Sequence, residues 1–479
     1  MTRLASFSFD FNKLILQSSS LNQFPPELLT RIFAIYPPQT IQSPLNYTQV
    51  CSRWRSVAYS SPELWTTLVI EHPPALETES DATYYEAALT SWVLRCSDLS
   101  VDISFLGRYY RGTWDLPSQF QISLYVPICN KLLVDFSNKW RRLKAPYFWS
   151  AHFFPSSLKQ FAALEELELG VGNCSPPKND HTPFPKTPRL FKLSLNLSRI
   201  LRFHCIKNFI PETVRDLTVT SASGPIGISG DFAIEFLQPK RLQHLTHMDM
   251  SQFGWTTPHV LPSITLPRLQ ELTLDGAITA LGDILGVFTL PSLRKLSLSI
   301  SRFDGDGEHG PVVGPALIAL LKRSYHDQCG LVALGLTSML ASDNSNEAIS
   351  LEALHCILSL ASTIKELHIC SEGYTDTARL MEILRYDRVS PEKQILPLLT
   401  TFSVESLINL DQDFLDFVHS RWWPNNSSPR MVGVAKLEKL IVSYCDLTEE
   451  IEEQLDACYE GGLEVEVEVE SSEQSSILE

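Results

Sequence analysis

Apolar residues recur along most of the chain in a six-residue pattern, apolar-x-x-apolar-x-apolar. The clear copies are LEELEL (164–169), LFKLSL (190–195), VRDLTV (214–219), LTHMDM (245–250), LQELTL (269–274), LRKLSL (293–298), LVALGL (331–336), IKELHI (364–369), LTTFSV (399–404) and LEKLIV (437–442). WRRLKA (140–145) is a degenerate earlier copy. The last two apolar positions alternate inward from one strand, and the first lies in the same core. Each copy therefore predicts a short β-strand.

The segments between these strands have helical periodicity. They are ITALGDILGVF (278–288), PALIALLKRSY (315–325), EAISLEALHCILSLAS (347–362), TARLMEILRYD (377–387) and DQDFLDFVHSRWW (411–423), and an earlier helix is expected over 84–96, before a strand at 99–103. One strand and one helix cannot bury their own apolar sides, so neighbouring copies must stack. The pattern predicts an α/β fold: a curved parallel sheet with helices on its outer side.

The spacing of the copies is typical of leucine-rich repeats, whose period is roughly 20–29 residues. The interval is 24 residues from 269 to 293, but 38 from 293 to 331. The copies also lack the Asn or Cys turn position of regular members of that family. The region therefore resembles an irregular leucine-rich-repeat solenoid, expected over 99–470.

A different pattern occupies residues 24–68. Two prolines open a short helix in which Leu28, Leu29, Ile32 and Phe33 form one apolar face, and the next two prolines end it. Residues 37–44 are expected to be a loop, and a second helix is expected from about Leu45 through Val57. The sequence Pro62-Glu63-Leu64-Trp65 predicts a third, shorter turn of helix before an apolar run to Ile70. A unit of this size buries a small core and usually needs a partner or a larger neighbour.

This block resembles an F-box. The resemblance rests on Phe24-Pro25-Pro26-Glu27-Leu28-Leu29-x-x-Ile32-Phe33, then Val50-Cys51-x-x-Trp54-Arg55-x-Val57-Ala58, then Pro62-x-Leu64-Trp65. Three ordered parts at compatible spacing are more specific than any one short motif. Phe24 stands where the family usually has Leu, and the connection between the first two helices is long. The F-box is expected over 21–70, after a tail at 1–20 and before a connector and linking helix at 71–98.

The resemblance implies a function. F-box proteins dock on a Skp-family adaptor of a cullin-RING ubiquitin ligase, while their second domain holds a protein substrate. Carried over to this chain, the adaptor contact would come from Phe24, Pro25, Pro26, Leu28, Leu29, Ile32 and Phe33. Val50, Trp54, Val57, Leu64 and Trp65 would be partly contact and partly local core. The ubiquitin chemistry would belong to other subunits, and this chain would supply proximity.

Substrate contacts are expected on the outward positions of the predicted strands. These positions are mixed in charge, which suits a folded protein or a peptide, although a solvated face is the alternative for any single residue. The candidates are Glu166, Glu168, Lys192, Arg215, Glu271, Lys295, Glu366 and His368. Trp422 and Trp423 precede a loop and are further candidates, because Trp is enriched at binding hot spots; burial in the core is the alternative for them. Three inserted loops (171–188, 301–314 and 422–433) could add contacts.

The segment GGLEVEVEVE alternates strictly between valine and glutamate after Leu463. It predicts a half-buried strand with a charged outer face, which closes the array and discourages edge-to-edge pairing. A loose tail is expected over 471–479.

Composition and charge narrow the functional classes. The chain has 479 residues, 44% of them hydrophobic, which is ample for a globular core. Its formal net charge is −16, from 55 acidic and 39 basic residues, which argues against a nucleic-acid-binding surface. No run of eighteen apolar residues predicts a membrane span. The ten cysteines contain no C-x-x-C pair, so free thiols are expected, with no metal site and a cytoplasmic or nuclear location.

Several motifs imitate active sites. Gly305-x-Gly307-x-x-Gly310 has the spacing of a dinucleotide-binding turn, but the acidic residues between these glycines would repel a pyrophosphate. The same stretch fails as a calcium loop, with His309 where glycine and Pro315 where glutamate is required. The pair His244 and His247 lacks the glutamate of a zinc protease motif, and 227–230 lacks the last glycine of a nucleophile elbow.

We therefore predict a non-catalytic substrate-receptor subunit without cofactor. Two other classes stay open. In the first, the chain is a repeat scaffold and the F-box-like block only caps the solenoid. In the second, it is a cofactor enzyme that uses residues 304–310.

Overall fold

The computed structural model describes residues 24–35, 40, 48–72, 76–107, 109–110, 113–114, 119–145, 158–171, 185–197, 210–221, 226–228, 239–255, 263–300, 313–325, 330–340, 348–371, 376–386, 395–407, 410–422 and 434–468. The chain is a mixed α/β protein whose main strands are parallel. It forms two compact units, one of residues 1–170 with 182–190 and the other of residues 171–181 with 191–479.

The first unit begins with helices and continues into parallel strands. Its helices are α2 (Pro26–Ile35), α4 (Ser52–Tyr59), the 3-10 helix η2 (Pro62–Trp65), α5 (Glu79–Arg95) and α6 (Gln119–Asp135). Its strands are β1 (Thr67–His72), β2 (Val101–Gly107), β5 (Trp140–Ala145) and β6 (Glu166–Val171), hydrogen-bonded in that order. A short antiparallel pair, β3 (Tyr109–Tyr110) and β4 (Thr113–Trp114), follows β2.

The second unit repeats one parallel strand after another. The strands are β7 (Lys192–Leu197), β8 (Asp216–Ser221), β10 (His247–Trp255), β12 (Glu271–Gly276), β14 (Lys295–Ile300), β15 (Ala333–Thr337), β16 (Glu366–Cys370), β17 (Thr401–Glu405), β18 (Lys439–Ser443) and β19 (Glu464–Glu468), in this spatial order. β9 (Ile226–Ile228) pairs with β10, and β11 (Ile264–Thr265) pairs with β13 (Phe288–Thr289).

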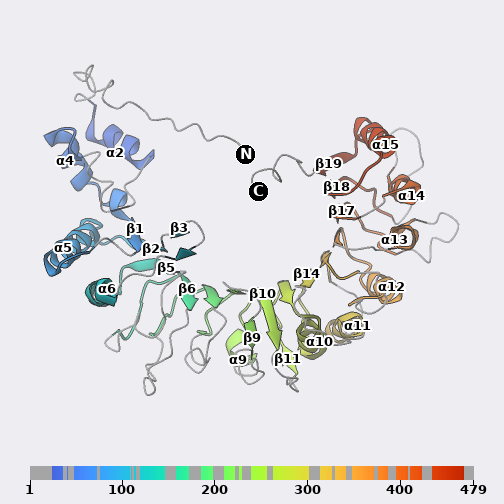
Figure 1. Cartoon of the computed structure of the whole chain (residues 1–479), viewed down its shortest axis with the longest axis horizontal. Coiled ribbons are helices and arrows are strands. Elements are labelled where there is room, and N and C mark those ends of the chain that lie inside the picture. Colours follow the sequence, from blue (N-terminus) through green and yellow to red (C-terminus); the bar gives the residue numbers. More distant parts are fainter. Residues whose placement is uncertain are drawn as a thin grey trace. The chain divides into compact units, whose positions relative to one another are not determined.

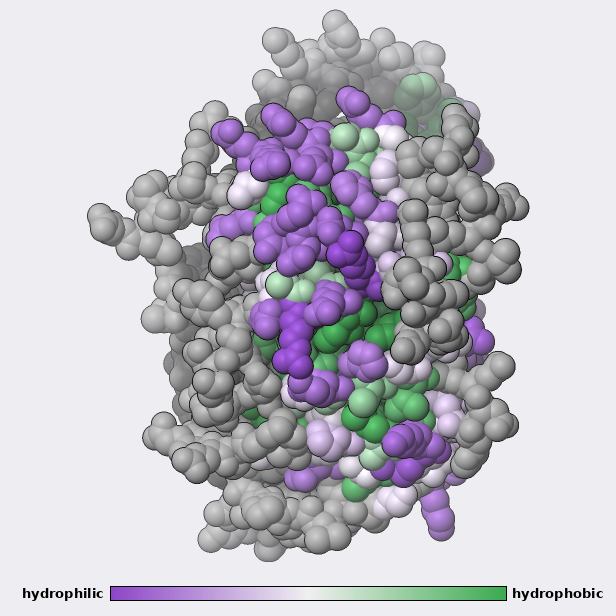
Figure 2. Space-filling view, turned by 90° about the vertical axis from the view of Figure 1, so that its right-hand side faces the viewer, coloured by the Kyte–Doolittle hydropathy of each residue, from purple (hydrophilic) through white to green (hydrophobic). Residues whose placement is uncertain are grey.

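Helices connect the later strands of this unit. They are α9 (Pro239–Leu242), α10 (Ile278–Val287), α11 (Val313–Ser324), α12 (Leu351–Leu360), α13 (Thr377–Leu384), α14 (Gln412–Arg421) and α15 (Glu449–Glu460). Consecutive helices from α10 to α15 contact one another and lie on one side of the strands (Figure 1). Figure 2 shows the side of the molecule on the right of Figure 1, where hydrophilic residues are interspersed with smaller hydrophobic areas.

The six-residue pattern locates the strands correctly. In LQELTL, for example, β12 begins at the third residue, and all three apolar residues are buried: Leu269, Leu272 and Leu274. The same holds from LEELEL to LEKLIV, where the residues at the three apolar positions of the pattern are at most 6% exposed. In register, Leu272 pairs with Leu296 and Leu274 with Leu298, so the inward leucines of adjacent strands stack into one core.

The predicted helices agree with the structure to within a few residues, with three differences. Helix α5 starts at Glu79, earlier than expected, because Thr78 and Asp81 form a capping box. Helices α6, α9 and α15 were not predicted. The second N-terminal helix, expected from about Leu45 through Val57, is interrupted before Ser52: Cys51 is extended and its thiol accepts a hydrogen bond from the Trp54 N–H, so α4 begins at Ser52.

Several predicted features lie outside the described residues. They are the tails at 1–20 and 471–479, most of the loop at 37–44, the motif at 304–310, Trp423, and most of the three inserted loops. Within the described ranges, no helix has both the length and the apolar character needed to cross a bilayer.

Candidate functional site

Helix α2 has two apolar sides with different surroundings. Leu29 and Phe33 are fully buried, whereas Leu28 is 44% exposed and Ile32 40% exposed. Ile35 extends the exposed side and is 68% exposed. Residues spaced by three and four lie on one face of a helix, so Leu28, Ile32 and Ile35 form a continuous apolar stripe open to solvent.

The buried side of α2 packs on α4 and η2. The Phe33 and Trp54 rings are 5.1 Å apart between centroids. The Thr30 hydroxyl lies 2.9 Å from the Ser61 hydroxyl, which donates to the Val57 carbonyl. These contacts hold α2 in one orientation and leave its outer apolar stripe accessible to a partner.

The aromatic residues of the second and third predicted parts are internal. Trp54 and Val57 are each 6% exposed, Leu64 is 2% and Trp65 is 1% exposed. The Trp65 indole N–H donates to the Ala58 carbonyl at 2.8 Å, which satisfies its polar atom inside the core. These four residues therefore shape the block and do not lie on its surface.

The remaining predicted adaptor residues are more accessible than these four. Pro25 and Pro26 are exposed, whereas Phe24 and Val50 are half-buried. Arg53 donates a hydrogen bond to the Phe24 carbonyl at 2.7 Å, which fixes the chain just before α2. Ile35 was not among the predicted residues, although its spacing from Leu28 and Ile32 is the signal that could have found it.

Helix α5 completes the core of this block. The Trp65 and Trp92 rings meet edge to face with centroids 4.9 Å apart, and Arg95 lies 4.7 Å from the Trp65 ring and 4.3 Å from the Tyr59 ring. The Cys96 thiol also hydrogen-bonds to the Trp65 carbonyl, and burial raises its pKa to about 11. The helical block thus depends on residues that follow position 70, the predicted end of the F-box.

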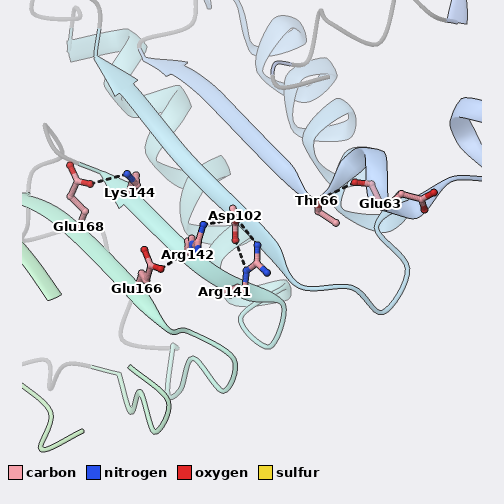
Figure 3. A network of polar contacts seen from close by, with 8 residues as sticks. All are labelled: Glu63, Thr66, Asp102, Arg141, Arg142, Lys144, Glu166 and Glu168. Carbon is pink, nitrogen blue, oxygen red and sulfur yellow. Dashed lines mark hydrogen bonds and ion pairs between the residues drawn. The ribbon is translucent and has the colours of Figure 1, made fainter. Parts of the chain in front are cut away.

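A second candidate surface is the polar face of the parallel sheet. In the first unit this face carries a network of ion pairs across β2, β5 and β6 (Figure 3). Arg141 binds Asp102 through two nitrogens, at 2.9 and 2.7 Å, which raises the pKa of Arg141. The Arg142 Nε lies 3.0 Å from the Glu166 Oε1, and the Lys144 Nζ lies 3.4 Å from the Glu168 Oε2. The predicted substrate residues Glu166 and Glu168 therefore already have partners on the neighbouring strand.

In the second unit the first row of outward residues also places acidic side chains next to a histidine and a lysine. The His247 Nδ1 lies 2.7 Å from the Asp216 Oδ1, and the His247 Nε2 lies 3.6 Å from the Glu271 Oε2. The Lys295 Nζ lies 3.4 Å from the Glu271 Oε1. Lys192 pairs in register with Asp216, while Arg215 directly precedes β8; both side chains are exposed. The structure brings the candidates Glu271 and Lys295 together and places Lys192 in the same row.

The later strands carry the remaining sheet candidates. Glu366 is exposed on β16, and His368 follows two residues along the same strand. The His368 ring lies 2.9 Å from the Ser403 hydroxyl and 3.7 Å from the Glu405 carboxylate. The face around β16 and β17 is therefore polar.

Trp422 is only 8% exposed at the end of α14. A side chain added at Gly461 would meet its ring at 2.6 Å, so the indole packs directly on the backbone after α15. Trp422 thus belongs to the core that joins these two helices.

The enzyme-like motifs gain no support. His244 lies 3.2 Å from the Arg268 guanidinium, and His247 is held by the acidic row of the sheet. Among the described residues, no group of His, Cys, Asp and Glu is arranged to hold a metal ion.

Comparison with known proteins agrees with the sequence reading of the N-terminal block. The model of the F-box-like family matches residues 21–71. A search of curated proteins finds no match to this chain. The chain therefore contains an F-box-like domain, and its exposed apolar stripe on α2 lies within that domain.

Proposed function

We propose that this protein is the substrate-recognition subunit of a Skp–cullin–F-box ubiquitin ligase. In this role the F-box-like domain docks a Skp-type adaptor, and the parallel-strand region, an irregular leucine-rich-repeat array, binds a protein substrate. The chain itself is non-catalytic, because F-box proteins generally act as receptor subunits and the ubiquitin chemistry resides in other subunits of the complex.

One observation carries the proposal: the stripe of Leu28, Ile32 and Ile35 in an F-box-like domain. Leaving three large aliphatic side chains partly in water on a ten-residue helix forgoes about 25 cal/mol for each Å² of apolar surface left uncovered. A protein partner that covers the stripe recovers this free energy. The exposed Pro25 and Pro26 lie beside the start of the stripe and would widen the contact.

The buried members of the predicted set support the contact indirectly. Leu29, Phe33, Trp54, Val57, Leu64 and Trp65 form the core that presents the stripe, and Phe24 and Val50 lie at its border. Substitutions in this core would reduce adaptor binding only by unfolding the block.

The proposed substrate surface is the polar face of the parallel strands, taken separately in each unit. Its candidate residues are Glu166 and Glu168 in the first unit, and Lys192, Arg215, Glu271, Lys295, Glu366 and His368 in the second. Those engaged in cross-strand ion pairs would give register and specificity more than affinity, because each pair must be partly undone on binding.

The test is a binding measurement between the purified full chain and a Skp-type adaptor. Ile32→Asp and Ala34→Asp form a matched pair, since each adds one carboxylate to an exposed position of α2 and only Ile32 belongs to the stripe. We expect Ile32→Asp, alone or with Leu28→Asp, to abolish binding while Ala34→Asp retains it. Circular dichroism verifies that each variant is folded. A folded wild-type chain that does not bind the adaptor would overturn the proposal and leave a repeat scaffold capped by a helical block.

A further inference from the structure

Strand β19 is the last strand of the second unit and is hydrogen-bonded to β18 alone in the described part of the chain. The Glu464 N–H donates to the Glu438 carbonyl, and the Glu468 carbonyl accepts from the Tyr444 N–H. Along a parallel strand, the N–H and C=O groups of alternate residues point to opposite sides. The backbone groups of Val465 and Val467 therefore point away from β18, toward the free edge.

The apolar row of the sheet is also incomplete at this edge. Val467 pairs in register with Val442, yet Val467 is 43% exposed and Val442 is 1% exposed. Val442 is covered because another strand lies beyond it. Val467 has no such neighbour among the described residues. The edge thus offers both unpaired backbone groups and an apolar side chain that one more strand would cover.

The outward row of β19 consists of Glu464, Glu466 and Glu468. On β18, the Lys439 ammonium bridges Glu464 and Glu466, with both distances 2.7 Å. This contact raises the pKa of Lys439 and shows how a basic side chain on a neighbouring strand is held. A basic residue on the opposite side would meet the same row of carboxylates.

Charge decides which strand fits the edge. A second copy of β19 would bring glutamates against glutamates, which is unfavourable for residues opposite each other on adjacent strands. Residues 469–479, VESSEQSSILE, contain three glutamates and no lysine or arginine, so they complement the row no better. Lys439 bridges two of these carboxylates and the Ser443 hydroxyl donates to the third, Glu468, which leaves three acidic groups served by one cation. A foreign strand with basic residues adds cations to this row, pairs the backbone groups and covers Val467.

We propose that the free edge of β19 binds an extended segment of a partner protein in which lysine or arginine alternates with apolar residues. The basic side chains lie against Glu464, Glu466 and Glu468, and the apolar ones cover Val465 and Val467. Main-chain hydrogen bonds supply affinity, and the alternation supplies specificity. This inference goes beyond the ligase role, because the edge lies in the other unit and its binding is measured without an adaptor.

The first experiment uses fluorescence anisotropy of labelled peptides with the full chain. The probe is Lys-Val-Lys-Val-Lys-Val-Lys, acetylated and amidated. One control peptide has the same composition in blocks, and a second has glutamate in place of lysine. We expect the alternating peptide to bind at least about tenfold more tightly than either control. Equal binding of the block peptide would reduce the interaction to non-specific charge attraction and overturn the proposal.

The second experiment changes the edge itself. Val467→Pro removes a backbone N–H that points to solvent, a position where an edge strand tolerates proline, while Val467→Thr keeps that N–H. We expect the proline variant to lose binding about tenfold and the threonine variant to retain most of it. Full binding by the folded proline variant would contradict strand addition.

A charge exchange keeps the test decisive if the proline variant does not fold. Glu466→Lys/Glu468→Lys should lose the lysine peptide and gain the glutamate peptide. Glu453→Lys/Glu460→Lys, at exposed positions of α15, makes the same change in net charge and should leave peptide binding within about twofold. Equal losses in the two double variants would overturn the proposed site.

Discussion

The indole N–H of Trp92 donates a hydrogen bond to the backbone carbonyl of Trp65 at 2.8 Å, inside the core that α5 shares with the N-terminal helices. The core of the F-box-like domain therefore includes Trp92, which lies more than twenty positions beyond the end of the family match at residue 71. Any variant that disturbs Trp92 is expected to disturb the domain that presents the stripe on α2.

We predict that Trp92→Phe lowers the free energy of unfolding by about 1–2 kcal/mol, since it leaves the Trp65 carbonyl without this donor. Trp92→Ala should cost about 3–5 kcal/mol, because it also opens a cavity beside Trp65. Urea denaturation of the full chain measures both values. Tyr84→Ala, on the same helix but at a side chain that is 79% exposed, should change stability by less than about 0.5 kcal/mol. A comparable loss in Tyr84→Ala would contradict the assigned role of Trp92.

Asp102 is expected to be the most important carboxylate of the ion-pair network on the first unit. It accepts two hydrogen bonds from Arg141 and is the least exposed member of its ion pairs, at 17%. Asp102→Asn should destabilise the chain by about 1–2 kcal/mol, and Glu168→Gln by less than about 0.5 kcal/mol, because the Lys144 pair is largely in solvent. Chemical denaturation at low and high salt measures the loss of stability in each variant. Equal losses in Asp102→Asn and Glu168→Gln would show that burial of the carboxylate does not decide which ion pair stabilises the chain more.

Arg421 is a buried cation whose described hydrogen-bond partners are backbone carbonyls. Its guanidinium donates to Leu384, Ile395 and Leu396 at 2.8, 2.6 and 2.9 Å, and burial lowers its pKa to about 10. Arg421→Met should cost about 2–4 kcal/mol, because the Leu384 and Ile395 carbonyls lose the guanidinium donor inside the core, whereas the Leu396 carbonyl keeps its bond from the Leu399 N–H. Arg385→Met removes an exposed pair with Asp416 and should cost less than about 1 kcal/mol. Thermal unfolding compares the two, and a small effect at Arg421 would mean that water replaces the guanidinium.

The capping box at the start of α5 predicts a specific pH dependence. The hydrogen bond from the Thr78 hydroxyl lowers the pKa of Asp81 below its ordinary value of 3.8. A carboxyl whose pKa is lowered by folding stabilises the folded state above its ordinary pKa and loses this effect as the pH falls through the lowered value. The difference in Tm between wild type and Asp81→Asn should therefore be constant above about pH 5 and shrink below pH 3.8. A difference that grows on acidification would contradict this sign.

Local patterns were sufficient to find the long parallel strands and most helices, but not the short strands β3, β4, β9, β11 and β13. In LRKLSL or LTTFSV, apolar residues spaced for a short strand have no other arrangement that buries all of them, so the strand starts could be predicted. Helices α6 and α15 escaped prediction for local reasons too: Pro127 interrupts the first pattern, and the second is dominated by exposed acids such as Glu449 and Glu453.

The division of the candidate sites into core and surface required contacts between distant residues. The pattern placed Leu28, Leu29, Ile32 and Phe33 on one apolar face, but four such residues on a short helix span an arc too wide for one neighbour to cover. The packing of Phe33 on Trp54 decided that Leu29 and Phe33 face inward and that Leu28 and Ile32 remain outside.

The partners of the residues on the sheet surface likewise depend on contacts between distant parts of the chain. That Glu166 lies next to Arg142, or that Val467 has no further strand beside it among the described residues, depends on which strands become neighbours. Periodicity along the chain specifies which side of a strand is apolar, because it records burial residue by residue. Pairing across the sheet, and with it the availability of each charge for a partner, arises only when segments from different parts of the chain meet in space.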